Sequence, residues 1–312
     1  MTARLRDYAV YGALRGAIGA LRLMSFARAA RVGGAVARLA YRPLGIRRRV
    51  VESQIALAFP AWDRAEVVRV ARAAYEHLGR TTVETALVPS LTREEVLALV
   101  DNADDWSHLE AARVASGGRG LVLITGHLGN WELAATYLAA RGLPMDVIAR
   151  RMANPLFDRY LTRSRERAGL TVLTDAEAVR RVPRSVRDGR GVGFVADQGV
   201  KGMASTFVPF FGRWAKTPRG PAVFALRLGV PALFVTLVRG PSGLFRLVVE
   251  PIAVEETGDR ERDVDVVVAR YTAVLERWVR QYPEQYFWHH RRWRRQPTEA
   301  EIERAERIAR LK

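Results

Sequence analysis

The side chains best suited to chemistry stand in the segment Ile124–Glu132, which reads Ile-Thr-Gly-His-Leu-Gly-Asn-Trp-Glu. The imidazole of His127 can take up and return a proton near neutral pH, and the carboxylate of Glu132 can stabilise the imidazolium that forms. Taken alone, such a pair is more often structural than catalytic. If catalytic, it supplies a base without a nucleophile, so the nucleophile would be a hydroxyl group of the substrate.

The spacing of this pair dictates which elements must carry it. On one continuous helix, side chains five residues apart point about 140° away from each other. We therefore expect His127 in a turn and Glu132 in the first turn of the following helix. Gly129 permits a tight turn, Asn130 is a good N-cap, and the positive end of the helix dipole keeps Glu132 ionised.

The elements around this turn predict an α/β fold with a largely parallel sheet. Short apolar runs of strand length alternate with helical stretches. The predicted strands are 120–125, 146–149, 171–173, 191–196, 232–238 and 245–250. Helices are predicted over 63–88, 93–100, 101–118, 263–280 and 298–312, and from Asn154-Pro155 and Thr217-Pro218, where a capping residue precedes proline.

The N-terminal residues 1–45 differ from the α/β domain predicted over residues 46–312. They are rich in small and apolar residues that arginines interrupt, and no run approaches the roughly 20 apolar residues of a spanning helix. Arg4, Arg15 and Arg22 fall within about 20° of one another on a helix, which leaves a broad apolar face. This pattern favours amphipathic helices at a membrane surface, broken near Ser25 or Phe26, over helices that only cover the protein's own core.

The net charge and the amino-acid composition favour certain binding partners and exclude several kinds of chemistry. The 50 basic and 33 acidic residues give a net charge of +17, which suits nucleic acid, an anionic membrane surface or an acidic carrier protein. The absence of cysteine excludes disulfides, thiolate zinc sites and a thiol nucleophile. Phosphate-loop, H-E-x-x-H and G-x-S-x-G patterns are also missing, which argues against nucleotide hydrolases, zincins and serine hydrolases.

Several stretches in order resemble one enzyme family. His127-x4-Glu132 matches the HX4D/E box of the glycerolipid acyltransferases, and HLGNWE resembles the form in the lipid A late acyltransferases, the lauroyl and myristoyl transferases. The further matching stretches are Arg150–Asp158, Ala196–Gln198, Phe207–Gly212, Thr217–Gly220 and Tyr282–Trp293. The resemblance is strong over residues 120–297 and implies a glycerolipid-acyltransferase-like sheet flanked by helices.

The resemblance also implies roles for single residues. His127 would be the general base, Glu132 its support, and Arg150 the group that stabilises the oxyanion. Positions expected to bind substrate or support the site are Asn130, Asn154, Asp158, Asp197, Gln198, Thr217 and Arg219. Simpler interpretations stay open: Asn130, Asn154 and Thr217 as helix caps, Asp197 as part of a structural ion pair, and Phe207–Phe211 as core instead of an acyl groove.

The implied activity is transfer of a fatty acyl group from acyl carrier protein, or from coenzyme A, to a hydroxyl of a lipid A precursor. The resemblance implies no cofactor, no metal and no acyl-enzyme. It places the protein on the cytoplasmic face of the inner membrane, lying on it or anchored by a single helix, with a phosphorylated glycolipid as acceptor. Acylation of a phosphatidylinositol mannoside is an alternative. From a different class, a nucleic-acid-binding protein is the alternative, because it would explain the net charge. No nucleic-acid partner is expected, however, because only Trp288–Arg295 interleaves aromatic and basic residues.

Overall fold

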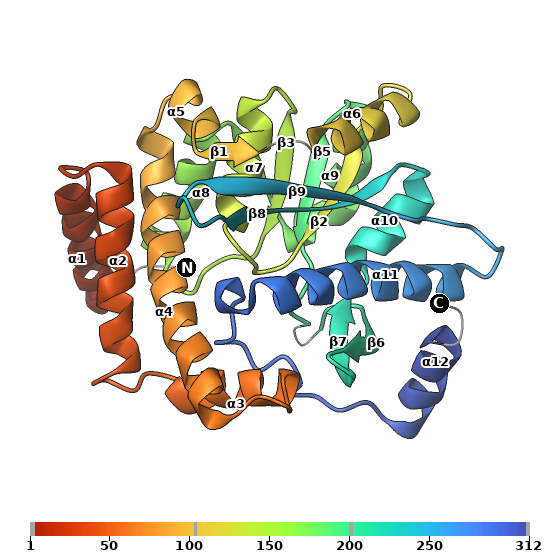
Figure 1. The fold of residues 1–312 in the computed structure, drawn as a ribbon. Coiled ribbons are helices and arrows are strands. Elements are labelled where there is room, and N and C mark those ends of the chain that lie inside the picture. The colour runs from red at the N-terminus through yellow and green to blue at the C-terminus, as the bar shows by residue number, and fades with distance from the viewer. Residues whose placement is uncertain (1–3, 103–104, 200–201, 310–312) are drawn as a thin grey trace.

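A mixed sheet at the centre of the molecule carries the segments that end at the predicted site (Figure 1). The computed structural model describes residues 4–102, 105–199 and 202–309, and within them this sheet has seven strands in the order β1-β9-β8-β2-β5-β3-β4. Their bounds are β1 Val100–Asn102, β2 Leu121–Thr125, β3 Met145–Ala149, β4 Leu170–Thr174, β5 Gly191–Val195, β8 Ala232–Arg239 and β9 Phe245–Ile252. Only the β8–β9 pair is antiparallel, so the predicted α/β class with a largely parallel sheet is confirmed.

The register of the parallel strands determines which loops meet at the carboxyl edge of the sheet. β2 and β5 are neighbours, and Thr125 pairs with Val195 at their ends. β3 lies on the other side of β5, with Val147 opposite Gly193. Loops that follow β2, β3 and β5 therefore emerge side by side, at the edge where open α/β sheets bind their ligands.

Helices cover both faces of the sheet and divide the core into two main clusters. Apolar side chains of α5, α6 and α7 pack on one face, and those of α9, α10 and α11 pack on the other. Figure 1 shows α11 running across the molecule beneath β8 and β9. The helix bounds are α3 Arg48–Ala58, α4 Arg64–Leu87, α5 Arg93–Leu97, α6 Trp106–Ala115, α7 Trp131–Ala140, α8 Pro155–Arg167, α9 Asp175–Arg187, α10 Gly220–Leu228, α11 Arg260–Gln281 and α12 Glu299–Ala309.

Two helices, α1 Leu5–Leu21 and α2 Phe26–Tyr41, form a hairpin at one side of the molecule, with α2 next to α4 (Figure 1). The break predicted near Ser25 or Phe26 is confirmed. The single apolar face predicted for the first helix is not: Tyr11 and Ile18 pack inward, whereas Leu5 and Tyr8 are exposed. Within the described ranges, the helices are too short or too polar to cross a bilayer.

Three local predictions differ from the structure. Residues 100–102 form the edge strand β1, and helix α6 begins only at Trp106. β6 Ser205–Phe210 and β7 Arg213–Pro218 form an antiparallel hairpin that the sequence did not indicate. Thr217 therefore ends a strand instead of capping a helix, and α10 begins at Gly220. Residues 310–312 of the predicted last helix lie outside the described part.

Candidate active site

A tight turn after β2 presents His127 at the carboxyl edge of the sheet. Gly129 has a φ of +61°, and a Cβ atom there would lie 2.0 Å from the carbonyl oxygen of Leu237, so only glycine fits. The Asn130 side chain then caps α7 by accepting a hydrogen bond of 3.0 Å from the amide of Leu133. The predicted arrangement is confirmed: His127 lies in the turn and Glu132 in the first turn of the helix.

The imidazole of His127 is bound by Asp197, which follows the neighbouring strand β5. Each residue lies two positions beyond the paired residues Thr125 and Val195, so the register brings the side chains together. Nδ1 of His127 lies 2.6 Å from Oδ1 of Asp197, and the His127 amide donates to Oδ2 at 3.1 Å. Because Nδ1 donates to the carboxylate, the lone pair of the neutral ring is on Nε2.

Asp197 is held as a carboxylate in a buried position, with 1% of its surface exposed. Burial alone would raise its pKa, but the attraction and hydrogen bonds of His127, together with the charge of Arg292, lower that pKa to about 2. The side-chain amide of Gln198 lies 3.1 Å from Nδ1 of His127. A buried carboxylate behind an imidazole fixes its tautomer and orientation and stabilises the imidazolium that forms when the ring takes up a proton.

Glu132 has a partner other than the one predicted. Its carboxylate accepts two hydrogen bonds from the guanidinium of Arg165 on α8, at 2.5 and 3.0 Å. Among the described residues no hydrogen bond joins Glu132 to His127, and Asp197 makes the contact expected of Glu132. The physical reason is that a carboxylate in the first turn of α7 faces the neighbouring helix α8, whereas β5 delivers Asp197 directly behind the imidazole.

The His127 and Glu132 side chains line a cavity of about 650 Å³. Its charged and polar lining includes His127, Glu132, Arg150, Arg165, Asp175 and Gln198. Most of the remaining lining is apolar and comes from both faces of the sheet edge, for example Ala135, Val147, Leu161, Ile148, Phe194 and Phe224. Within the described ranges Arg150 forms no hydrogen bond or ion pair with a protein group. The cavity thus combines a base, a free cation and room for an apolar chain.

The other predicted contact residues lie outside the cavity lining and bind protein groups. Asn130 is fully buried and donates to Glu84, and Asn154 caps α8 and donates to the carbonyl oxygen of Asp7. Asp158 accepts from the amide of Met152. The remaining two are Thr217, which accepts from Arg292, and Arg219, which forms ion pairs with Glu261 and Asp265.

The Phe207–Phe211 segment and the aromatic and basic segment near the C-terminus contribute buried side chains to the core. Phe207 and Phe210 are 4% and 0% exposed, so they do not line an acyl groove. In the aromatic and basic segment near the C-terminus, Trp288, Arg292 and Trp293 are also buried. These side chains close the fold and do not form an exposed surface for stacking bases.

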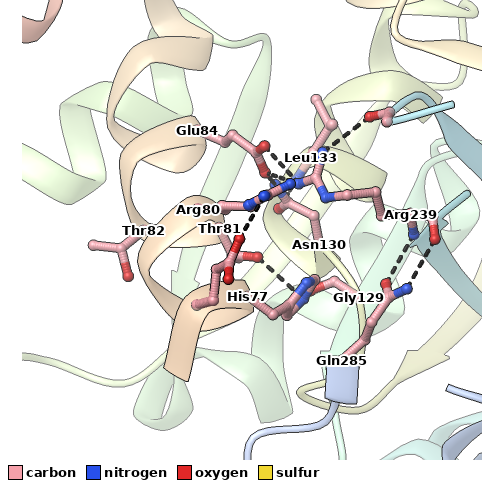
Figure 2. Close-up of polar contacts among 12 residues, drawn as sticks. His77, Arg80, Thr81, Thr82, Glu84, Gly129, Asn130, Leu133, Arg239 and Gln285 are labelled. Atoms are coloured by element: carbon pink, nitrogen blue, oxygen red, sulfur yellow. Dashed lines mark hydrogen bonds and ion pairs between the residues drawn. The ribbon is translucent and has the colours of Figure 1, made fainter. Parts of the chain in front are cut away.

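A buried polar network supports the turn that carries His127 (Figure 2). Glu84 on α4 is 1% exposed, accepts from Asn130 at 2.9 Å, and binds the guanidinium of Arg239 through both oxygens at 2.5 and 2.6 Å. Gln285 exchanges two hydrogen bonds of 2.8 Å with the backbone of Arg239, and its carbonyl oxygen accepts from the amide of Gly129. The network therefore joins α4, β8 and the C-terminal segment to the turn that carries His127.

His77 adds a pH-dependent contact to this network. Its Nε2 lies 3.0 Å from the carbonyl oxygen of Gly129, and burial lowers its pKa to about 4 (Figure 2). Because the unfolded chain takes up this proton near pH 6.5, the free energy of unfolding should fall as the pH drops from about 6.5 to about 4.

Between about pH 7 and pH 5, the free energy of unfolding of the wild type should fall by about 1–2 kcal/mol more than that of His77→Gln, because glutamine does not titrate in this range. Urea unfolding of both proteins at the two pH values measures this difference. His108→Gln is the matched control, since His108 is exposed on α6. An unchanged pH dependence in His77→Gln would show that His77 does not titrate as its burial requires.

Sequence reasoning missed the residues whose role depends on tertiary contacts. Arg165, Glu84, Arg239 and Gln285 each bind a residue at least 33 positions away, so no local pattern marks them. Asp197 was predicted only from the matching stretch Ala196–Gln198, and its contact with His127 was not predicted.

Known proteins share this sequence over most of its length. The model of the bacterial lipid A biosynthesis acyltransferases matches residues 3–295. The chain is 26% identical over 257 residues to the lipid A biosynthesis palmitoleoyltransferase of Escherichia coli (strain K12), covering 81% of this chain and 80% of that protein. It is 25% identical over 269 residues to the lipid A biosynthesis lauroyltransferase of the same organism, with 86% and 85% covered. It is also 29% identical over 221 residues to the phosphatidylinositol mannoside acyltransferase of Mycolicibacterium smegmatis, with 69% of each covered.

Proposed function

Because the chain belongs to the bacterial lipid A biosynthesis acyltransferase family and is an O-acyltransferase, we propose that it moves a fatty acyl group from acyl carrier protein to a hydroxyl of a lipid A precursor. The observation that carries this proposal is the His127 imidazole, backed by buried Asp197, in the wall of a largely apolar cavity. A thioester acyl chain needs such apolar room, and a lipid hydroxyl needs a base.

In the proposed reaction the acceptor hydroxyl gives its proton to Nε2 of His127 while its oxygen attacks the thioester carbonyl carbon. Asp197 stabilises the imidazolium through Nδ1. The carbonyl oxygen becomes an oxyanion, which the guanidinium of Arg150 stabilises. When the tetrahedral intermediate collapses, the carbon–sulfur bond breaks and the imidazolium returns its proton to the departing thiolate. The ester and the free thiol are released, and no covalent enzyme intermediate forms.

Glu132 takes a positioning role in this mechanism. Its bidentate ion pair with Arg165 ties α7 to α8, and both side chains line the cavity. Glu132 thereby keeps the part of the cavity wall that α8 forms at a set distance from His127. We expect its removal to raise the KM for lipid substrate together with lowering kcat, because the cavity would change shape.

The proposed acyl donor, acyl carrier protein, can be tested because its binding should depend on salt concentration. The net charge of +17 attracts an acidic carrier protein over a long range, and salt screens this attraction. We expect the KM for acyl carrier protein to rise by about tenfold between low salt and about 0.5 M salt, with little change in kcat. Steady-state rates with acyl carrier protein and with acyl coenzyme A of the same chain length measure this. A salt-independent KM, or a preference for acyl coenzyme A at low salt, would contradict the proposed donor.

A phosphatidylinositol mannoside is a second candidate acceptor, because the chain is 29% identical to an acyltransferase named for that lipid. Both acceptors are best compared in mixed micelles with the same labelled donor. Transfer to the lipid A precursor but not to the mannoside supports the first proposal. The opposite result assigns the second acceptor without changing the mechanism.

We also propose that the enzyme works at the cytoplasmic face of the inner membrane. The hairpin of α1 and α2 exposes large apolar side chains, and a loop after it exposes two more. These side chains are Leu5, Tyr8, Val10, Leu23, Met24, Val32, Val36, Leu39, Leu44 and Ile46. Interspersed with exposed arginines, they suit insertion into the headgroup region of an anionic bilayer.

A further inference from the structure

A second hollow lies between α1 and α8, apart from the active-site cavity. Its volume is about 170 Å³, more than ten times the roughly 10–15 Å³ that one water molecule requires. The lining consists of four arginines, two tyrosines and a leucine, and none of these residues is acidic. They are Tyr11, Arg15, Leu156, Arg159, Tyr160, Arg163 and Arg167. We call this hollow the α1–α8 cleft.

Among the described residues, the arginines that line the α1–α8 cleft have no acidic side chain to neutralise them. Within the described part of the chain, no ion pair is formed by Arg15, Arg159, Arg163 or Arg167. The three on α8 are spaced four residues apart and project on one face, an arrangement of like charges that disfavours a helix. The helix dipole favours a cation at Arg167 in the last turn, but it offers nothing to Arg159 near the start.

Specific side-chain contacts order the walls of the α1–α8 cleft. The rings of Tyr11 and Tyr160 pack edge to face with centroids 6.3 Å apart, and Tyr160 is 8% exposed. The guanidinium of Arg15 lies over the Tyr160 ring, 5.3 Å from its centroid, and contacts the Tyr11 hydroxyl. Asn154 joins the two helices by donating to the carbonyl oxygen of Asp7. These contacts hold Arg15 in place and fix α1 against α8 on either side of the hollow.

We propose that the α1–α8 cleft binds the phosphate group of an anionic membrane lipid that is not the lipid being acylated. Guanidinium groups match phosphate oxygens with paired, charge-assisted hydrogen bonds. A membrane source fits because Tyr8, two turns before Arg15 on the same side of α1, is exposed and apolar. Arg165 and Leu161 line the active-site cavity from the opposite face of α8, so a helix about 10 Å wide separates the two sites.

The test compares two variants that each remove two positive charges. Arg159→Gln/Arg163→Gln alters the α1–α8 cleft, and Arg187→Gln/Arg227→Gln alters two exposed helical arginines on α9 and α10 that form no ion pair in the described part of the chain. Full-length proteins are sedimented with phosphatidylcholine vesicles that contain or lack phosphatidic acid, at one ionic strength and without an acyl donor. We expect the cleft variant to bind phosphatidic acid vesicles about tenfold more weakly than wild type, and the control to stay within about twofold.

Three results would overturn the proposal. Equal losses in both variants would mean that overall charge, and not the α1–α8 cleft, attracts the vesicles. Stabilisation by inorganic phosphate that the cleft variant loses, without any preference for phosphatidic acid vesicles, would assign the site to free phosphate. A raised KM for acyl carrier protein in the cleft variant, with unchanged vesicle binding, would make the cleft a carrier contact. Because vesicle binding needs no catalysis, failure of the proposed reaction would leave this test intact.

Discussion

Replacing His127 with alanine should lower kcat for acyl transfer by about 10²–10⁴-fold, because the acceptor hydroxyl would lose its base. His127 is partly exposed at the cavity wall, so its removal should leave the protein folded. The rate is measured with labelled acyl carrier protein and lipid A precursor in mixed micelles. Asp197→Asn should also lower kcat, since an amide neither stabilises the imidazolium nor imposes the tautomer that leaves the lone pair on Nε2.

His108→Ala serves as the matched control for His127→Ala. His108 lies on α6, and among the described residues its ring bonds only to the carbonyl oxygen of Val249, so His108→Ala should keep the wild-type rate. Far-ultraviolet circular dichroism and thermal unfolding verify that each variant is folded. A folded His127→Ala enzyme that keeps more than about a tenth of the wild-type rate would disprove the assigned base. Loss of activity in both histidine variants would point to a general defect.

Replacing Arg239 with methionine should lower the free energy of unfolding by about 3–5 kcal/mol, because the Glu84 carboxylate would remain buried without its cation. The two side chains are 13% and 1% exposed, so water cannot take over the lost contacts. Denaturation by urea measures the loss. We also expect kcat to fall, since Glu84 holds Asn130, and Asn130 caps the helix that follows the turn with His127.

An exposed ion pair provides the control for Arg239→Met. Arg69 and Glu66 lie three residues apart on α4 with 61% and 36% of their side chains exposed, so Arg69→Met should cost no more than about 1 kcal/mol. A double variant, Glu84→Leu/Arg239→Met, should recover part of the stability because no buried charge remains. Equal small losses in Arg239→Met and Arg69→Met would show that the buried network does not hold the turn.

The conformation of the turn that carries His127 was predictable from the sequence because its determinants are local. A strand, a glycine with positive φ, an asparagine cap and an acidic first helical turn all lie within the twelve residues Leu121–Glu132. The partner of His127 was not predictable in the same way, because Asp197 is 70 residues away along the chain. Its position depends on which strands are neighbours, and the order β2-β5-β3 does not follow from the pattern of any single strand.

The β6–β7 hairpin was missed for a different physical reason. Phe211 and Gly212 form the two-residue turn, and both have positive φ, as a type I′ turn requires. Asparagine or aspartate is usual at the first of these positions, so phenylalanine there conceals the turn. Phe211 instead packs against Trp288 and beneath the guanidinium of Arg280, and these contacts offset its unfavourable backbone conformation. Tertiary packing thus overrode the local preference.

The pairing of Thr125 with Val195 has a consequence for how related chains can vary. Strand register, and not the number of intervening residues, sets the distance from His127 to Asp197. Insertions or deletions between α7 and β5 can therefore accumulate during evolution without displacing the imidazole from its carboxylate. A single-residue insertion within Leu121–Thr125 or Gly191–Val195 would separate them by one strand position and reverse the side of the sheet each faces. Length polymorphism among homologues should consequently concentrate in the loops 141–144 and 188–190 and spare the two strands.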